Sequence, residues 1–299
     1  MPATHPPDLR QRIVFAFTRT AAMLQAPDVV SLTPVPCPSA TFTVWTSAWL
    51  AGAAAPDDVL DALAPWADAH DVQAADADTA RVTALPSPGE PVSSVTFLLA
   101  ALRRSAPRGP ARLVLPVPGD ARGLPGPGPF SHQAMSAGEG VLFAEAGLGI
   151  VPTSVAEGVL RWTVYPVADP GPPPEFVALN QAERELRDQV RQSASVLTSL
   201  GVARHRPGVR EEIAAALRAR PTSLWPAGMP GQPLRVLQHA DEVEAILAAA
   251  SVDEPGGALS ASAATARREA LRPIETAVRV ARRAAVAEAV RILAASPLV

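Results

Sequence analysis

Residues 169–174, Asp-Pro-Gly-Pro-Pro-Pro, limit the fold of this chain more than any other stretch. Three consecutive prolines remove three backbone N–H donors and fix three φ angles, so neither a helix nor a sheet continues through them. Before this run, strand-like and helical patterns alternate, and after it apolar residues recur only at helical spacing. We therefore predict an α+β fold. An N-terminal mixed α/β domain with one sheet at 1–168 precedes a proline-rich linker at 169–174 and an all-α helical domain at 175–299.

Short runs of β-branched and aromatic residues predict the strands of the N-terminal part, because these side chains suit a pleated, half-buried surface. The expected strands are 41–46, 80–85, 112–117, 141–152 and 158–167. Only Thr153–Glu157 separates the last two, which favours an antiparallel hairpin. The second and third flank a helical stretch, so we expect a right-handed β-α-β crossover there.

Helices in the N-terminal part are expected where capping residues precede apolar residues spaced three and four apart. They are 8–25, 49–54, a helix beginning at Pro56, 93–104 and a single turn at 131–138. The helix at Pro56 has two further signals: proline suits a first helical turn, and the carboxylates of Asp57 and Asp58 complement the helix dipole.

The C-terminal part is predicted to contain four helices, at 179–201, 209–220, 234–250 and 260–295. In the first helix one apolar series keeps a three-and-four spacing over its whole length: Leu179, Ala182, Leu186, Val190, Ser193, Leu197 and Leu200. This spacing puts the series on one helix face, which we expect to be buried. Pro273 lies inside the last helix and is expected to bend it.

The complete absence of lysine excludes several kinds of chemistry. All 26 basic residues are arginine, so a P-loop lysine, a pyridoxal Schiff base, a kinase-type lysine and a Ser-Lys nucleophile cannot occur.

Cys37 is the single cysteine, so neither an internal disulfide nor a cysteine-rich metal site can form. Gly147 and Gly149 lack the third glycine of a dinucleotide-binding turn. We assign no catalytic residue and no cofactor.

An acidic stretch at 68–78 is the only candidate for metal binding. Carboxylates beside an imidazole could bind a divalent cation, and the residues concerned are Asp68, His70, Asp71, Asp76 and Asp78. Their spacing matches neither a calcium loop nor a two-histidine helix motif. We interpret the stretch as a solvated acidic loop and assign no metal ligand.

The Pro/Gly-rich loop at 116–132 is the candidate ligand site. Proline and glycine specify its backbone path, and loops on a rigid scaffold often bind ligands. Within it Arg122 is a candidate for contact with an anion, His132 for proton transfer, and Asp120 for acid–base work beside them. The alternative is a loop with ordinary solvated charges, and the residue types alone favour that alternative.

Seven arginines in the last helix raise the possibility of phosphate contacts: Arg267, Arg268, Arg272, Arg279, Arg282, Arg283 and Arg291. Three glutamates, Glu269, Glu275 and Glu288, alternate with them, and the helix lacks aromatic residues for stacking on bases. The sequence therefore argues against nucleic-acid binding.

No run of eighteen apolar residues occurs, and the charges near the N-terminus depart from a signal-peptide pattern. We expect a soluble, cytoplasmic protein without membrane contact.

Four segments resemble an uncharacterised protein family of high-GC Gram-positive, actinobacterial-type bacteria. They are RLVLPVPGDARGLPGPGPF, AGLGIVP, ERELRDQV and GGALSA. The resemblance runs through most of 95–295 and implies a cytoplasmic protein with a two-part layout. No activity is known for that family, so the resemblance transfers no functional residue.

Our leading hypothesis is a cytoplasmic, non-enzymatic protein that acts through protein–protein interaction. The partner would be an unknown protein or a second copy of the chain, with the helical domain as the association surface. One alternative is a small-molecule-binding protein or enzyme with its site around the loop at 116–132. A second alternative is nucleic-acid binding through the C-terminal basic helix.

Overall fold

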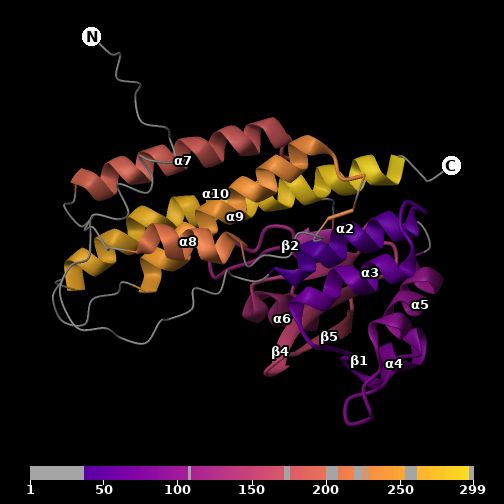
Figure 1. Ribbon diagram of the computed structural model, residues 1–299. Coiled ribbons are helices and arrows are strands. Elements are labelled where there is room, and N and C mark those ends of the chain that lie inside the picture. Colours follow the sequence, from indigo (N-terminus) through magenta and orange to yellow (C-terminus); the bar gives the residue numbers. More distant parts are fainter. Residues whose placement is uncertain are drawn as a thin grey trace. The chain divides into compact units, whose positions relative to one another are not determined.

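The computed structural model describes residues 37–106, 109–171, 176–199, 208–218, 225–226, 228–252 and 261–295. They fall into two compact units, which we treat separately (Figure 1). The α/β unit contains the described residues within 36–176, 221–234 and 283–299, and the helical unit those within 177–220 and 235–282. An N-terminal α+β region followed by a helical region confirms the predicted fold class. The helix expected at 8–25 lies outside the described residues.

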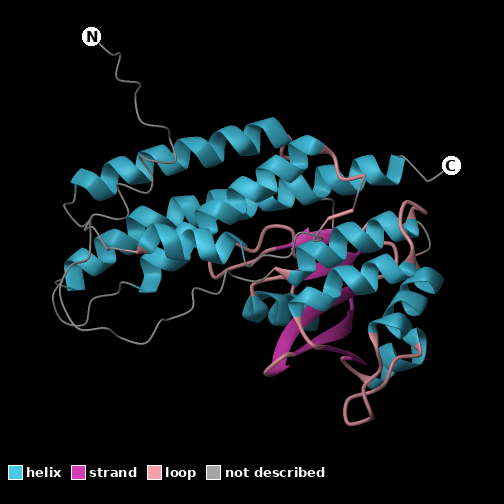
Figure 2. Cartoon of the chain, viewed as in Figure 1, coloured by secondary structure: helices cyan, strands magenta, loops and turns pink. Residues whose placement is uncertain are grey.

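A five-stranded mixed sheet organises the α/β unit (Figure 2). In chain order the strands are β1 (Ala69–Ala74), β2 (Arg112–Val114), β3 (Gly140–Phe143), β4 (Leu148–Ala156) and β5 (Val159–Pro166). Their order across the sheet is β1-β5-β4-β3-β2. β1 pairs in parallel with β5, and all other neighbours are antiparallel. The predicted β4–β5 hairpin is therefore confirmed, although its turn is Glu157-Gly158 and not Thr153–Glu157.

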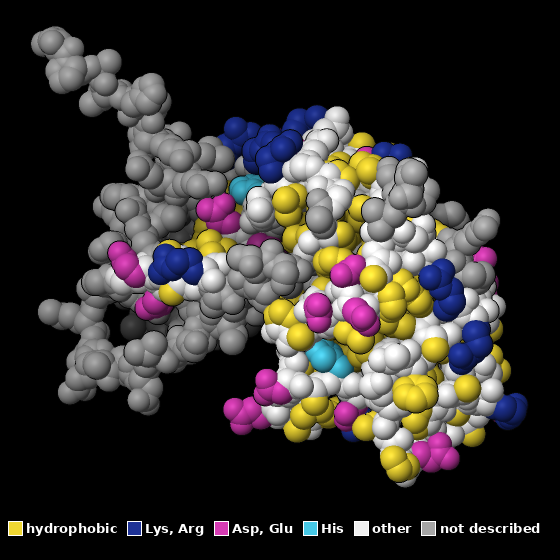
Figure 3. Space-filling view, turned by 45° about the vertical axis from the view of Figure 1, so that its right-hand side comes forward, with side chains coloured by type: hydrophobic (Ala, Val, Ile, Leu, Met, Phe, Trp, Pro, Cys, Tyr) yellow, Lys and Arg dark blue, Asp and Glu magenta, His cyan; other side chains and the backbone are white. Residues whose placement is uncertain are grey.

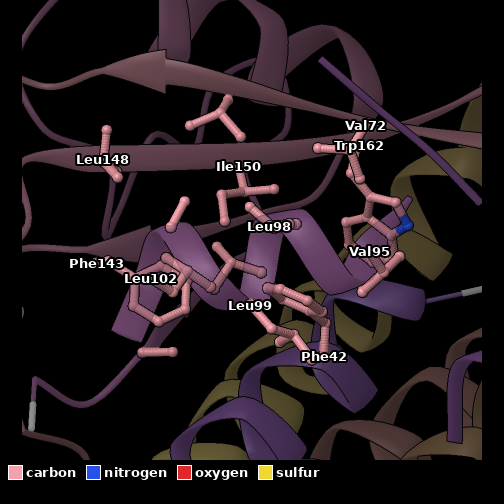
Figure 4. Close-up of a cluster of buried hydrophobic side chains, with 14 of the residues drawn as sticks. Phe42, Val72, Val95, Leu98, Leu99, Leu102, Phe143, Leu148, Ile150 and Trp162 are labelled. Carbon is pink, nitrogen blue, oxygen red and sulfur yellow. The ribbon is translucent and has the colours of Figure 1, made fainter. Parts of the chain in front are cut away.

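Helices cover both faces of this sheet. On one face lie α2 (Pro38–Leu50), α3 (Pro56–Leu63), α4 (Ala77–Thr83) and α5 (Val95–Ser105), followed at α3 by the short 3-10 helix η1 (Ala64–Trp66). Their apolar side chains pack with those of β1, β3, β4 and β5 in the larger core, where Phe42 lies 4.8 Å from Trp162 between ring centroids (Figure 4). On the other face α6 (Pro129–Ala137) packs Phe130 and Ala134 against β3 and β4 in a smaller core. The sheet thus forms the middle of a layered unit.

The strand predicted at 41–46 is wrong, because this segment lies inside helix α2. Twelve of the thirteen residues of α2 are buried, so the helix has no polar face and shows no helical hydrophobic period. Its buried threonines suit a helix: the Thr43 hydroxyl donates to Ser39 O at 2.6 Å and the Thr46 hydroxyl to Phe42 O at 2.5 Å. The helix expected at 49–54 is likewise wrong, since α2 ends at Leu50.

Four further predictions in this unit are wrong. The acidic loop at 68–78 contains strand β1, and the strand at 80–85 lies largely within helix α4, which Asp76 caps by accepting a bond from Thr79 N–H at 2.7 Å. Because that strand is a helix, the β-α-β crossover does not exist. The long strand at 141–152 is broken by the turn at 144–147 into β3 and β4. The helix at 93–104 and the helical turn at 131–138 are confirmed as α5 and α6.

The helical unit contains α7 (Leu179–Ser199), α8 (Val209–Arg218), most of α9 (Gly231–Val252) and α10 (Ala261–Ala295) as far as Arg282. All four predicted helices are confirmed, with α9 beginning before its predicted start. The buried residues of α7 are the predicted series without its last member, Leu200, which lies outside the described residues: Leu179, Ala182, Leu186, Val190, Ser193 and Leu197.

A buried ion cluster joins α9 to α10. The Arg282 side chain is 6% exposed and donates to Asp241 Oδ1 at 2.6 Å and to Glu244 Oε2 at 2.6 Å. Both carboxylates are largely buried themselves. Taking these charges out of water is unfavourable, and the three groups offset that cost only while they remain paired.

Candidate functional site

A pocket lies on the α/β unit where β3 stops and the β4–β5 hairpin continues. β3 pairs with β4 only from Val141 opposite Ile150 to Phe143 opposite Leu148, whereas β4 runs on to Ala156. The pocket is lined by this extension of β4, by the start of β5, and by the ends of α6, η1 and α2. The mismatch in strand length thus creates the concavity.

The pocket has a volume of about 410 Å³ and a mixed lining. Its apolar walls are Pro38, Trp66, Ala67, Ala137, Pro152, Val159 and Leu160. Its polar residues are Gln133, Ser136, Glu139, Thr153 and Ser154. Ligand sites range over roughly 300–1,000 Å³, so the volume suits a small molecule or one large side chain.

Two polar groups of the lining, the Glu139 carboxylate and the Trp66 indole N–H, are held in place by the fold. The Glu139 carboxylate accepts a hydrogen bond from Ser39 N–H at 2.9 Å, which satisfies a free amide in the first turn of α2. The indole nitrogen of Trp66 is buried and has no hydrogen-bond partner in the described part of the chain. Trp66 therefore presents its ring carbons, and not its N–H, to solvent at the pocket.

The Pro/Gly loop folds back on itself beside β2. Val117 N–H donates to Asp120 O at 3.0 Å and Asp120 N–H to Val117 O at 2.8 Å, so Pro118 and Gly119 form a tight turn. The positive φ of Gly119, 87°, is the value that such a turn needs at its second central residue. The glycine and proline content of this part of the loop thus has a structural explanation.

Asp120 and Arg122 bind each other. The Arg122 guanidinium donates to both carboxylate oxygens of Asp120, at 2.7 Å each. These hydrogen bonds lower the pKa of Asp120 to about 2. Arg283 donates to the backbone oxygen of Arg122 at 2.7 Å. The ion pair between Asp120 and Arg122, together with the hydrogen bond from Arg283, thus fixes the conformation of this part of the loop.

The structure places His132 apart from the Asp120–Arg122 ion pair. His132 is exposed on α6, and neither it nor Asp120 or Arg122 lines the pocket. Sequence reasoning selected the loop and missed the pocket residues next to it in the chain, Gln133 and Ser136. One signal was available: Pro152 inside a strand-like run indicates an open strand edge.

The acidic stretch is engaged in structural bonds. His70 Nε2 lies 2.9 Å from Leu63 O, and Trp162 Nε1–H donates to His70 Nδ1 at 3.1 Å, so the ring is neutral with its proton on Nε2. Burial lowers the pKa of His70. Asp71 pairs with Arg161 and Asp78 with Arg81. Among the described residues, no three His, Cys, Asp or Glu side chains converge as metal ligands do.

The arginines of α10 are partly committed to other contacts. Arg282 is buried with two carboxylates, Arg283 donates to the loop, and Arg291 pairs with Glu288 at 2.7 Å. On the face shown in Figure 3, several basic side chains gather at the top of the view, and others lie scattered among acidic and uncharged ones.

The described part of the chain therefore combines a mixed-sheet α/β unit that carries an open pocket with an all-helical unit. No helix within the described ranges is both long and apolar enough to cross a membrane. The chain belongs to the Rv1486c-like family: that family's N-terminal domain matches residues 39–177 and its C-terminal domain residues 180–283. The resemblance stated from the sequence is confirmed.

Mycobacterial relatives show how far the similarity extends. Uncharacterized protein Rv1486c of Mycobacterium tuberculosis is 40% identical over 282 residues, uncharacterized protein ML1804 of Mycobacterium leprae 35% over 288, and uncharacterized protein MAV321 of Mycobacterium avium 32% over 297. Each alignment covers 84% of this chain and 96% of the relative. Their names assign no activity, and no solved structure matches the chain.

Proposed function

We propose that this chain is a cytoplasmic, non-enzymatic protein that acts by binding another protein at the pocket of the α/β unit. The observation that carries the proposal is the pocket itself, an open concavity of about 410 Å³ with mostly apolar walls, beside the exposed end of a hairpin. Concave apolar sites that receive one anchoring side chain are typical of the energetic centres of protein interfaces.

Two further observations support a binding role for this unit. The side chains that could act in proton transfer at the sequence-predicted positions hold structural bonds or lie outside the pocket, as Asp120 and His132 do. In the helical unit, charges on the outer side of α7 pair within the helix, Arg187 with Glu183 and Arg191 with Asp188. That face resembles a solvated surface more than the association surface first expected there.

Site-specific photocrosslinking in cells tests the proposal. A benzophenone amino acid at Ser136, in the pocket lining, is expected to form an adduct with another protein. The same residue at Val82, which is 73% exposed outside the pocket lining, is the matched control and is expected to form none. Equal adducts at both positions, or adducts at neither, would contradict the proposal. Fractionation of the same cells checks that the protein is cytoplasmic.

The second candidate is a small-molecule-binding protein using the same pocket. Its volume lies within the range of ligand sites, and Gln133, Ser136 and Thr153 offer polar groups that could orient a ligand. A thermal-shift screen with a metabolite library tests this candidate. A compound that stabilises the wild-type chain but not an Ala137→Phe variant, whose new ring fills the pocket, would favour it over the protein partner.

A further inference from the structure

The extension of β4 beyond β3 leaves part of a strand edge open. Backbone N–H and C=O groups of successive residues in an antiparallel strand point alternately to its two neighbours. Val167 N–H donates to Gly147 O at 2.7 Å, which makes Gly147 and Val167 a hydrogen-bonded pair in the β4–β5 register. Residues 149, 151 and 153 therefore point their main-chain groups toward β5, and residues 150, 152 and 154 point away from it.

Of these outward residues only Ile150 lies opposite a β3 residue, Val141. At Pro152 and Ser154 the structure shows no main-chain hydrogen bond from any other described residue. The outward main-chain groups here are the C=O of Pro152, a buried residue that lines the pocket, and the N–H of Ser154, an exposed residue just before the β-bulge between Ser154 and Ala156. A proline at position 152 is consistent with this direction. An N–H group there would point to the open side, so its absence costs no hydrogen bond to β5.

The pocket lies directly against this edge. Pro152, Thr153 and Ser154 form one of its walls, and Pro38 and Ala137 form parts of the others. A peptide strand paired with β4 projects alternate side chains to the two faces of the sheet, so one of them would enter the pocket. The apolar walls, Trp66 and Leu160 among them, suit an apolar side chain there.

We propose that this site binds an extended segment of a partner protein by strand addition to β4, with one apolar side chain of the segment held in the pocket. The inference rests on the proposed function and gives its recognition mode. Main-chain bonds to Pro152 and Ser154 supply affinity, and the pocket supplies selectivity. Because the ends of α2 and α6 stand beside the edge, it admits a single chain more readily than the β4 edge of a second folded copy.

The test uses the full-length chain as bait for a phage library of randomised nonapeptides, and the strongest binder is resynthesised. Its affinity is then measured for the wild type, for Ser154→Pro and for Ser154→Ala. Ser154→Pro removes one outward N–H donor and is expected to weaken binding roughly tenfold, as the loss of one main-chain bond implies. Ser154→Ala keeps the N–H and is expected to bind like the wild type.

A second arm leaves the protein unchanged and methylates the peptide nitrogens one at a time. Strand addition predicts an alternating pattern: methylation at every second nitrogen abolishes binding, and methylation of those between leaves the affinity within about threefold. A uniform response, or one confined to adjacent positions, overturns the proposal even if the Ser154→Pro variant fails to fold.

The outcomes separate this inference from the proposed function. Peptides that bind the wild type and Ser154→Pro equally, with crosslinks still formed from Ser136, would retain a protein partner and overturn strand addition. Absence of both crosslinks and enriched peptides would overturn both. Light scattering that shows a dimer which Ser154→Pro converts to a monomer would overturn the partner segment in favour of a second copy.

Discussion

The ring of Phe130 lies flat against the backbone of Gly149, so closely that a Cβ atom at Gly149 would come within 2.2 Å of Phe130 Cδ2. This contact seats α6 on β4 and therefore supports one wall of the pocket. It also gives a structural reason for one of the two glycines that resemble a fragment of a nucleotide-binding turn.

Gly149→Ala is expected to destabilise the chain by about 1–3 kcal/mol, because a methyl group forces Phe130 out of a packed core. Urea unfolding followed by circular dichroism measures the change. Gly126→Ala is the matched control, since a Cβ there meets no atom within 4 Å. Equal stability of the two variants would show that Phe130 moves away at no cost.

Arg282→Met is expected to cost about 3–5 kcal/mol, because it leaves Asp241 and Glu244 buried without their shared cation. Arg291→Met removes an exposed partner of Glu288 and is expected to change stability far less than Arg282→Met, because solvent screens an exposed ion pair. Adding Asp241→Asn and Glu244→Gln to Arg282→Met should recover part of the loss. If it recovers none, the destabilisation does not come from the loss of the Arg282 cation beside these two carboxylates.

His70 makes stability depend on pH in a defined direction. Its pKa is lowered in the folded chain, so between the folded value and the unfolded value of about 6.5 the unfolded chain binds more protons. The contribution of neutral His70 is therefore fully present above about pH 6.5 and is lost as the pH falls through the folded pKa. Unfolding free energies from pH 8 to 5 should decline more steeply for the wild type than for His70→Gln.

Thr41→Val is expected to stabilise the chain by about 1 kcal/mol. The Thr41 hydroxyl is buried in α2 and has no hydrogen-bond partner among the described residues, so replacing it by a methyl group removes a desolvated polar atom. Thr43→Val is the control, because the Thr43 hydroxyl donates to Ser39 O, and its loss should lower stability by up to about 1 kcal/mol. Thermal unfolding of both variants checks the opposite signs.

The sequence predicted those elements that have one buried face. Helix α7 lies between solvent and core, so its buried residues recur every three or four positions and could be listed in advance. Helix α2 is buried almost throughout, so burial left no period, and its β-branched threonines imitated a strand. The charged residues of β1 led to the wrong prediction of a loop. In the structure they belong to an edge strand, where His70 forms a hydrogen bond with Leu63 O and Asp71 pairs with Arg161.

The candidate site was harder to predict than the fold. Its walls come from residues as far apart as Pro38 and Leu160, and they meet only because the sheet and its helices bring them together. None has a chemistry that stands out in a sequence. The charged residues that did stand out, Asp120 and Arg122, bind each other.

The parallel pairing of β1 with β5 has a consequence for synthesis of the chain on the ribosome. Ala69 lies opposite Val159, so β1 leaves the ribosome about ninety residues before its partner. At roughly 5–20 residues per second, this strand waits about 5–20 s without its ladder. This edge pairing of the sheet therefore forms late, and in that interval the apolar side of β1 depends on α3, α4 and α5 for cover.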